Sequence, residues 1–264
     1  MFRGETLSHF SLRNAVIWFL LAFQSGMINA GGFLACGRFV SHITGFATLI
    51  GTDLAQSSVF HALGMLAVPG FFILGAMISG FLVDRRKIQG RSPRYSSVLF
   101  LIVLIHIGVL AAGLDERFGE FGEPVTYLRN YVLLALLCFV SGLQNAMVTS
   151  ASGAVVRTTH LTGITTDLGI GLVRVLFHNH KLSRIDEIRA VWMRIGVIAS
   201  FMLGSAIAAF IFIAHQYWGF ALPTMISLVI WYMTLKHFTL PSFREWLRIR
   251  EKLRISERLH RRKS

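Results

Sequence analysis

The sequence has little charge, few cysteines and few prolines. Of its 264 residues only 15% are charged, against about 25% in an average soluble domain. A soluble globule would need more polar surface, and a hydrophobic fraction of 54% excludes a disordered chain. The 2 cysteines, Cys36 and Cys138, cannot form a disulfide framework. The composition therefore indicates a polytopic helical membrane protein.

The charge that is present is mostly basic, with a formal net charge of +13. In a soluble chain this would suggest a nucleic-acid partner. In membrane proteins, however, Lys and Arg collect on the cytoplasmic loops. We therefore expect a lipid bilayer and no nucleic acid as partner. The first apolar run, 14–37, is too long for a signal-peptide core, so we expect a retained span there.

Several stretches are long and apolar enough to cross a bilayer, which takes about 20 residues. Six meet this length: 14–37, 59–83, 95–114, 131–153, 190–214 and 217–236. Two others, 42–57 and 160–177, are shorter and contain Asp53 and Asp167. An ionised group at mid-membrane is costly, so we expect these two segments to be broken or re-entrant.

The distribution of Lys and Arg favours six spans over eight. With six spans and a cytoplasmic N-terminus, 22 of the 26 basic residues lie in the cytoplasm. Eight spans would put the basic cluster at 85–94 outside. By the positive-inside rule, six spans with both termini in the cytoplasm are expected.

An internal repeat connects the two halves of the chain. The segment 25–30 recurs as 141–146, and Ser41-His-Ile-Thr-Gly45 recurs as Thr159-His-Leu-Thr-Gly163. The pattern at 72–81 recurs at 201–210 in the same order. Three spans per half would make the halves inverted, an architecture typical of secondary transporters. The expected divisions are a first repeat at 1–118, a second repeat at 119–240 and a tail at 241–264.

Polar residues gather in the two short segments and the spans before them. If these segments are helical, His42 and Asp53 lie within about 20° of one face, and so do His160 and Asp167. The candidate solute or ion pathway consists of Asn29, Arg38, His42, Thr44, Gly45, Asp53, Gln144, Asn145, Arg157, His160, Thr162, Gly163 and Asp167.

In the functional interpretation, His and Asp exchange protons along a pathway. The helix starts near Thr44 and Thr162, with Arg38 and Arg157, would contact an anion. The structural interpretation makes Thr44 and Thr162 helix N-caps and lets the acids bond neighbouring helices. Both interpretations stay open. We expect His106 to be a packing or interface residue and Gly75 and Gly204 to allow close helix packing. No known nucleophile or metal-binding motif occurs, so no catalytic residue, metal or cofactor is expected.

The tail differs from the rest of the chain. From Phe243 to Lys263 it carries nine Lys or Arg and three Glu, with apolar residues between them. This pattern predicts a basic amphipathic helix on anionic lipid. A solvated helix or a partner-docking tail is the alternative.

The motif from Gly142 through His160-Leu-Thr-Gly163 to Gly169 closely resembles the YoaK family of bacterial inner-membrane proteins. The segments 29–33 and 38–45 resemble its first-half motif, and the likeness extends from about 14 to 236. Phe46 departs from the pattern, since many members have Asn there. The resemblance implies a six-span bacterial inner-membrane protein of unknown function.

The expected fold is therefore an all-α transmembrane bundle of two inverted three-span repeats with two short broken or re-entrant segments. The first functional hypothesis is a secondary transporter or permease for a small solute, with proton coupling as an option. The alternatives are a membrane acid/base enzyme and a scaffold or regulatory subunit without a solute path. A homo-oligomer is left open.

Overall fold

A computed structural model describes residues 12–236 except 56–58, 124, 126–127, 154–157 and 178–180. The described residues form helices and connecting turns and no strand, which confirms the predicted all-helical class. The helices are α1 (Leu12–Cys36), α2 (Ile43–Ala55), α3 (Val59–Leu82), α4 (Asp84–Ile88), α5 (Tyr95–Leu114), α6 (Leu128–Ala151), α7 (Leu161–Phe177), α8 (Lys181–His215), the 3-10 helix η2 (Gln216–Phe220) and α9 (Ala221–Thr234).

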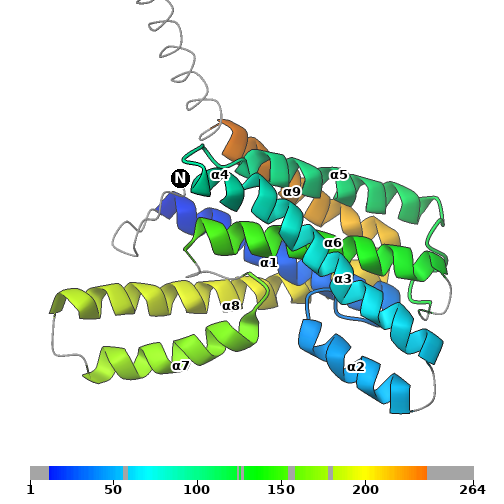
Figure 1. The fold of residues 1–264 in the computed structure, drawn as a ribbon, viewed down its shortest axis with the longest axis horizontal. Helices are drawn as coiled ribbons and strands as arrows, with labels where there is room; N and C mark the ends of the chain where they lie inside the picture. Colours follow the sequence, from blue (N-terminus) through cyan, green and yellow to red (C-terminus); the bar gives the residue numbers. More distant parts are fainter. Residues whose placement is uncertain are drawn as a thin grey trace, which may run out of the picture.

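Among the described residues, 5 helical runs are long and apolar enough to cross a membrane. The expected spans 190–214 and 217–236 fall in one of them, Arg184–Thr234. They form one run because the turn between α8 and α9 is itself helical, and Figure 1 shows the two helices running in opposite directions. Large apolar side chains such as Met77 and Phe210 are 65% and 79% exposed. Exposed apolar surface of this kind is what lipid would cover.

Two pairs of helices cross at glycines that lie directly against the backbone of the neighbouring helix. In the α1–α8 crossing, a Cβ added to Gly26 would clash with the carbonyl oxygen of Phe201, and one added to Gly204 would clash with that of Phe23. Close backbone approach of this kind is typical of membrane helices. The close packing expected at Gly204 is confirmed.

The α3–α6 crossing has the same form. A Cβ on Gly75 would clash with the carbonyl oxygen of Phe139, and one on Gly142 with that of Phe72. The close packing expected at Gly75 is therefore confirmed too. Between these crossings, buried apolar side chains of α1, α5, α6, α8 and α9 form the core.

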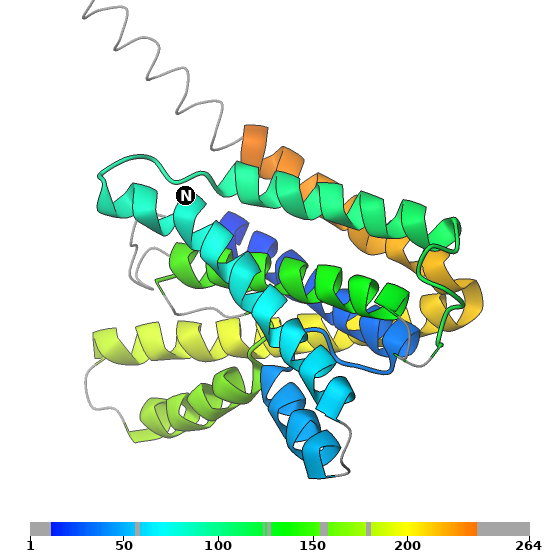
Figure 2. The ribbon, with the colours of Figure 1, turned by 45° about the vertical axis from the view of Figure 1, so that its right-hand side comes forward.

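The short helices α2 and α7 stand apart from the long ones. Both begin near the middle of the molecule, close to one another, and diverge as they run outward (Figure 1 and Figure 2). Helix α2 packs on α3, and α7 packs on α8. Each is held to the core through its fourth residue, Phe46 in α2 and Ile164 in α7, both buried.

The long helices run along one general direction, so that the molecule has two ends (Figure 1). The start of α1, helix α4, the start of α8 and the end of α9 lie toward one end (Figure 1). The start of α6 and η2 lie toward the other end. The basic residues around α4 are thus separated from η2 by the length of the bundle.

Candidate functional site

A cavity of about 480 Å³ opens beside the start of α7. It brings together two residues of the predicted pathway, Asn145 and His160. Its lining comes from α3, α4, α6 and the residue before α7: Phe72, Ala76, Asp84, Asn145, Ala146, Thr149, Ser150 and His160. Helices from both halves of the chain therefore contribute to one site, which we call the second-half cavity.

The hydroxyl of Ser150 forms hydrogen bonds with both an acid that lines the cavity, Asp84, and a nearby base, Lys87. Ser150 Oγ donates a hydrogen bond to the carboxylate of Asp84. Lys87 Nζ donates to the Ser150 carbonyl oxygen at 2.5 Å and to its Oγ at 2.9 Å. Because Ser150 is both donor and acceptor, the negative charge of Asp84 is compensated by Lys87 close by.

Asn145 lines the cavity and carries a buried acceptor without a partner among the described residues. The residue is only 7% exposed, and among the described residues its Oδ1 has no hydrogen-bond partner. A buried acceptor left unpaired costs about 1–3 kcal/mol. This oxygen is therefore suited to accept a hydrogen bond from a molecule that enters the cavity.

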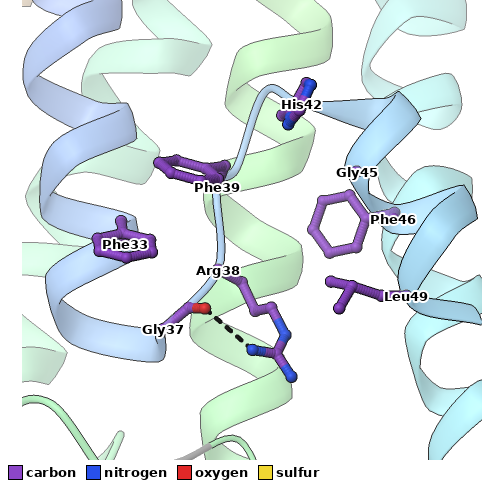
Figure 3. A pocket seen from close by; sticks show the side chains of 8 residues that line it. All are labelled: Phe33, Gly37, Arg38, Phe39, His42, Gly45, Phe46 and Leu49. Carbon is purple, nitrogen blue, oxygen red and sulfur yellow. Dashed lines mark hydrogen bonds between the residues drawn. The ribbon is translucent and has the colours of Figure 1, made fainter. Parts of the chain in front are cut away.

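The first half has a smaller pocket of about 200 Å³ beside the start of α2 (Figure 3). Three predicted residues, Arg38, His42 and Gly45, line it together with Phe33, Gly37, Phe39, Phe46 and Leu49. Arg38 Nη1 donates to the Gly37 carbonyl oxygen at 3.0 Å. The Phe39 ring stacks on Phe33 and meets the edge of the His42 ring. The pocket is thus mainly aromatic, with one guanidinium and one imidazole.

Two amide side chains of the predicted pathway, Asn29 and Gln144, already form hydrogen bonds within the protein. Asn29 Oδ1 accepts hydrogen bonds from Ser41 N at 3.4 Å and Ser41 Oγ at 3.1 Å. Gln144 Nε2 donates to the Leu21 carbonyl oxygen at 2.9 Å and to Ser25 Oγ at 2.7 Å. Asn29 therefore fixes the loop before α2, and Gln144 joins α6 to α1.

The histidines occupy the residue before each short helix. The His42 carbonyl oxygen accepts from Gly45 N at 3.0 Å, and that of His160 accepts from Ile164 N at 3.1 Å. Thr44 and Thr162 are consequently the second residues of α2 and α7 and are exposed. The interpretation of these threonines as N-caps is therefore wrong, because each helix begins one residue earlier.

The acids do not pair with the histidines in this structure. Asp167 is exposed, and Asp53 is half-buried, its Oδ2 unpaired among the described residues. Within that part of the chain, no hydrogen bond joins His42 to Asp53 or His160 to Asp167. Gly163 is half-buried at the start of α7. Arg157 lies outside the described residues.

Two residues that line the second-half cavity, Asp84 and Ser150, were missed by the sequence analysis, and so was Lys87, which donates to Ser150. Only the basic cluster at 85–94 was considered there, and not the acid that precedes it. The available signal was its position: Asp84 comes directly after an apolar span, where an acid has a reason to find a partner. The part of the chain described by the structure contains no group of three potential metal ligands.

A second polar cluster was also missed. Gln24 Nε2 donates to Ser227 Oγ at 2.6 Å, and His106 Nδ1 lies 2.7 Å from the same oxygen. All three residues are buried. They join α1, α5 and α9, so His106 takes part in a polar contact between helices and does not merely fill space. A histidine inside a very apolar stretch was the signal for it.

Comparison with known proteins gives a family and no activity. The model of a family described as "Protein of unknown function (DUF1275)" matches residues 17–233. No curated protein and no solved structure matches the chain. The match includes both pockets and supports the expectation of an uncharacterised membrane-protein-like family. It does not test the YoaK resemblance.

Proposed function

The chain belongs to this family of unknown function, DUF1275, and from that premise we propose that it is a membrane transporter or permease for a small solute. The observation that carries the proposal is the pair α2 and α7. They begin near one another and diverge outward, α7 alongside α8 and α2 alongside α3 (Figure 1 and Figure 2). Each is preceded by a histidine that lines a pocket. Short helices of this kind, with their N-termini near the midplane, are used by transporters to hold a solute.

Six spans, α1, α3, α5, α6, α8 and α9, are part of the proposal. Their alternating directions support it (Figure 1). Helix α8 has 35 residues, or about 52 Å at 1.5 Å per residue, which exceeds the hydrocarbon thickness of about 30 Å. Its charged first turns therefore extend past the membrane. The positive-inside rule assigns this end, with α4, to the cytoplasm of a bacterial inner membrane.

The inverted repeat is also part of the proposal, and the helix crossings support it. Gly26 and Gly142 are equivalent in the repeat, and so are Gly75 and Gly204. Gly26 packs on the α8 segment that contains Gly204, while Gly142 packs on the α3 segment that contains Gly75. The first span of each half thus meets the second span of the other half in the same way. Such an exchange is expected from a two-fold relation between inverted halves.

The polar residues would line the path. Ionisable residues inside a membrane are expensive and mark solute or proton pathways. His42 and His160 stand at the two helix starts, and Arg38 stands at the first-half pocket. An imidazole can accept and release a proton, so protons are candidate coupling ions. The bilayer is the main partner, with anionic lipid for the tail 241–264, which lies outside the described residues.

A membrane enzyme is the second candidate, because Asp84 and His160 line the same cavity. An acid and an imidazole in one cavity are the parts of an acid/base site. An enzyme would convert the solute, whereas a transporter would move it unchanged.

Flux into proteoliposomes tests the proposal. Purified protein would be reconstituted and offered labelled ions, amino acids, polyols, amides and weak acids, with and without a pH gradient. We expect at least one solute to enter unchanged and faster than into protein-free liposomes. His160→Ala should lower that rate by about tenfold, the effect of losing one charge-assisted hydrogen bond.

The matched control is Phe210→Ala, which truncates a side chain that is 79% exposed on α8. It should leave the rate unchanged. Equal rates with and without protein for every solute would contradict the proposal, and a chemically altered solute would favour the enzyme.

A further inference from the structure

We propose that Asn145 and Asp84 bind the solute in the second-half cavity, and that this solute is small, uncharged and donates hydrogen bonds through hydroxyl or amino groups. The inference rests on the proposed transport function and adds the chemical class of the solute. Three observations support it: the oxygen of Asn145 has no partner among the described residues, the charge of Asp84 is balanced by Lys87, and the corresponding Asn29 is already bonded.

The free acceptor is Asn145 Oδ1. It belongs to a side chain that is 7% exposed and lines the cavity, and the described residues offer it no hydrogen-bond donor. The neighbouring Gln144, by contrast, donates to two partners on α1. A ligand that donates an O–H or N–H to Asn145 would remove the cost of the unpaired oxygen.

The balanced charge excludes ions of either sign as the best ligand. Lys87 Nζ reaches Ser150, and Ser150 Oγ donates to Asp84. A cation in this cavity would be repelled by the charge of Lys87, which is bonded to the lining residue Ser150, and an anion would be repelled by Asp84. The Asp84 carboxylate still has acceptor capacity for a neutral donor, since an ionised carboxylate accepts about four hydrogen bonds. Phe72, Ala76 and Ala146 offer apolar surface to a small carbon skeleton.

The occupied counterpart is Asn29, which is equivalent to Asn145 in the repeat. Its Oδ1 accepts from the hydroxyl and the backbone N–H of Ser41. Ser41 is equivalent to Thr159, whose buried Oγ1 has no partner among the residues that the structure describes. In the first half, the asparagine oxygen is therefore already bonded, by the hydroxyl and the N–H of Ser41. In the second half, Asn145 Oδ1 has no such donor among the described residues. A ligand with a hydroxyl or an N–H, the two groups that Ser41 offers to Asn29, would supply it.

Glycerol and urea are suitable probes, with guanidinium as the charged counterpart of urea. Proteoliposomes loaded with each probe would be studied by stopped-flow light scattering. We expect protein-dependent flux of glycerol or urea, and none of guanidinium. Asn145→Ala should reduce the flux about three- to tenfold, since one hydrogen bond is lost. Asn145→Asp adds a negative charge beside Asp84 and should shift the preference from urea toward guanidinium.

Asn130→Ala is the matched control. Asn130 is also a buried asparagine of α6, but it donates to the Phe118 carbonyl oxygen and does not line the cavity. We expect this variant to retain the wild-type flux and selectivity. Unfolding curves of all variants separate a loss of binding from a loss of fold, and the changed selectivity of Asn145→Asp cannot arise from misfolding.

The outcomes separate this inference from the transport proposal. Flux of charged solutes alone, or unchanged flux and selectivity in both Asn145 variants, would overturn the inference and leave transport standing. No flux of any solute would overturn both.

Discussion

Two adjacent amides, Gln144 and Asn145, have opposite surroundings although both are buried. Successive helical residues point about 100° apart. Gln144 therefore faces α1, where it bonds Leu21 and Ser25, while Asn145 faces the cavity. At the scale of single residues, one amide serves the fold and the next is available to a ligand.

Gln144→Ala should lower the free energy of unfolding. Both hydrogen bonds to α1 are lost, and such bonds between membrane helices contribute about 0.6 kcal/mol each, with a maximum near 1.7. We expect a loss of about 1–2 kcal/mol, measured by unfolding in detergent. Gln89→Ala is the comparison, since Gln89 is exposed and should change stability little. Equal stability of Gln144→Ala and wild type would contradict the assignment.

The residue scale also shows what the sequence pattern could not resolve. It predicted that Asn29 and Asn145 are equivalent in a repeat, yet gave no reason for one to be bonded and the other unpaired among the described residues. That difference depends on where the loop before each short helix lies. Likewise, the sequence did not show that Phe46 is buried and anchors α2 to the core.

At the scale of elements, the fold depends on two helix crossings at which a glycine lies directly against the backbone of the neighbouring helix. A carbonyl oxygen cannot move away from a new Cβ unless its helix moves too. The four glycines at the two crossings therefore fix how closely α1 approaches α8 and how closely α3 approaches α6.

Gly142→Ala should destabilise the protein by about 1–3 kcal/mol, the usual cost of overpacking. The added Cβ would clash with the Phe72 carbonyl oxygen. If the halves are related by the proposed symmetry, Gly26→Ala should cost a similar amount. Gly70→Ala is the control, since a Cβ there meets nothing within 4 Å and should be neutral or stabilising by up to about 1 kcal/mol. Thermal unfolding in detergent measures all three, and a harmless Gly142→Ala would refute the crossing.

At the scale of the whole molecule, the proposed six spans make opposite ends face opposite sides of the membrane. Ser92 follows α4, and Glu120 follows α5. A cysteine at position 92 should react with a membrane-impermeant maleimide only from the cytoplasm, and one at position 120 only from outside. Both would be introduced into a variant without Cys36 and Cys138, labelled in spheroplasts and inverted vesicles. Labelling of both positions from the same side would rule out this arrangement.

The sequence by itself determined that the chain is helical, that its long apolar stretches suit a membrane, and that two short segments with polar residues each follow a long apolar one. Periodicity and composition carry this information because each stretch must satisfy its own backbone hydrogen bonds. Only the tertiary structure decided that Asp84 and Ser150 join Asn145 and His160 at one cavity, with Lys87 bonded to Ser150. These groups come from α4, α6 and the residue before α7. Their meeting depends on how α3 crosses α6, which no local pattern encodes.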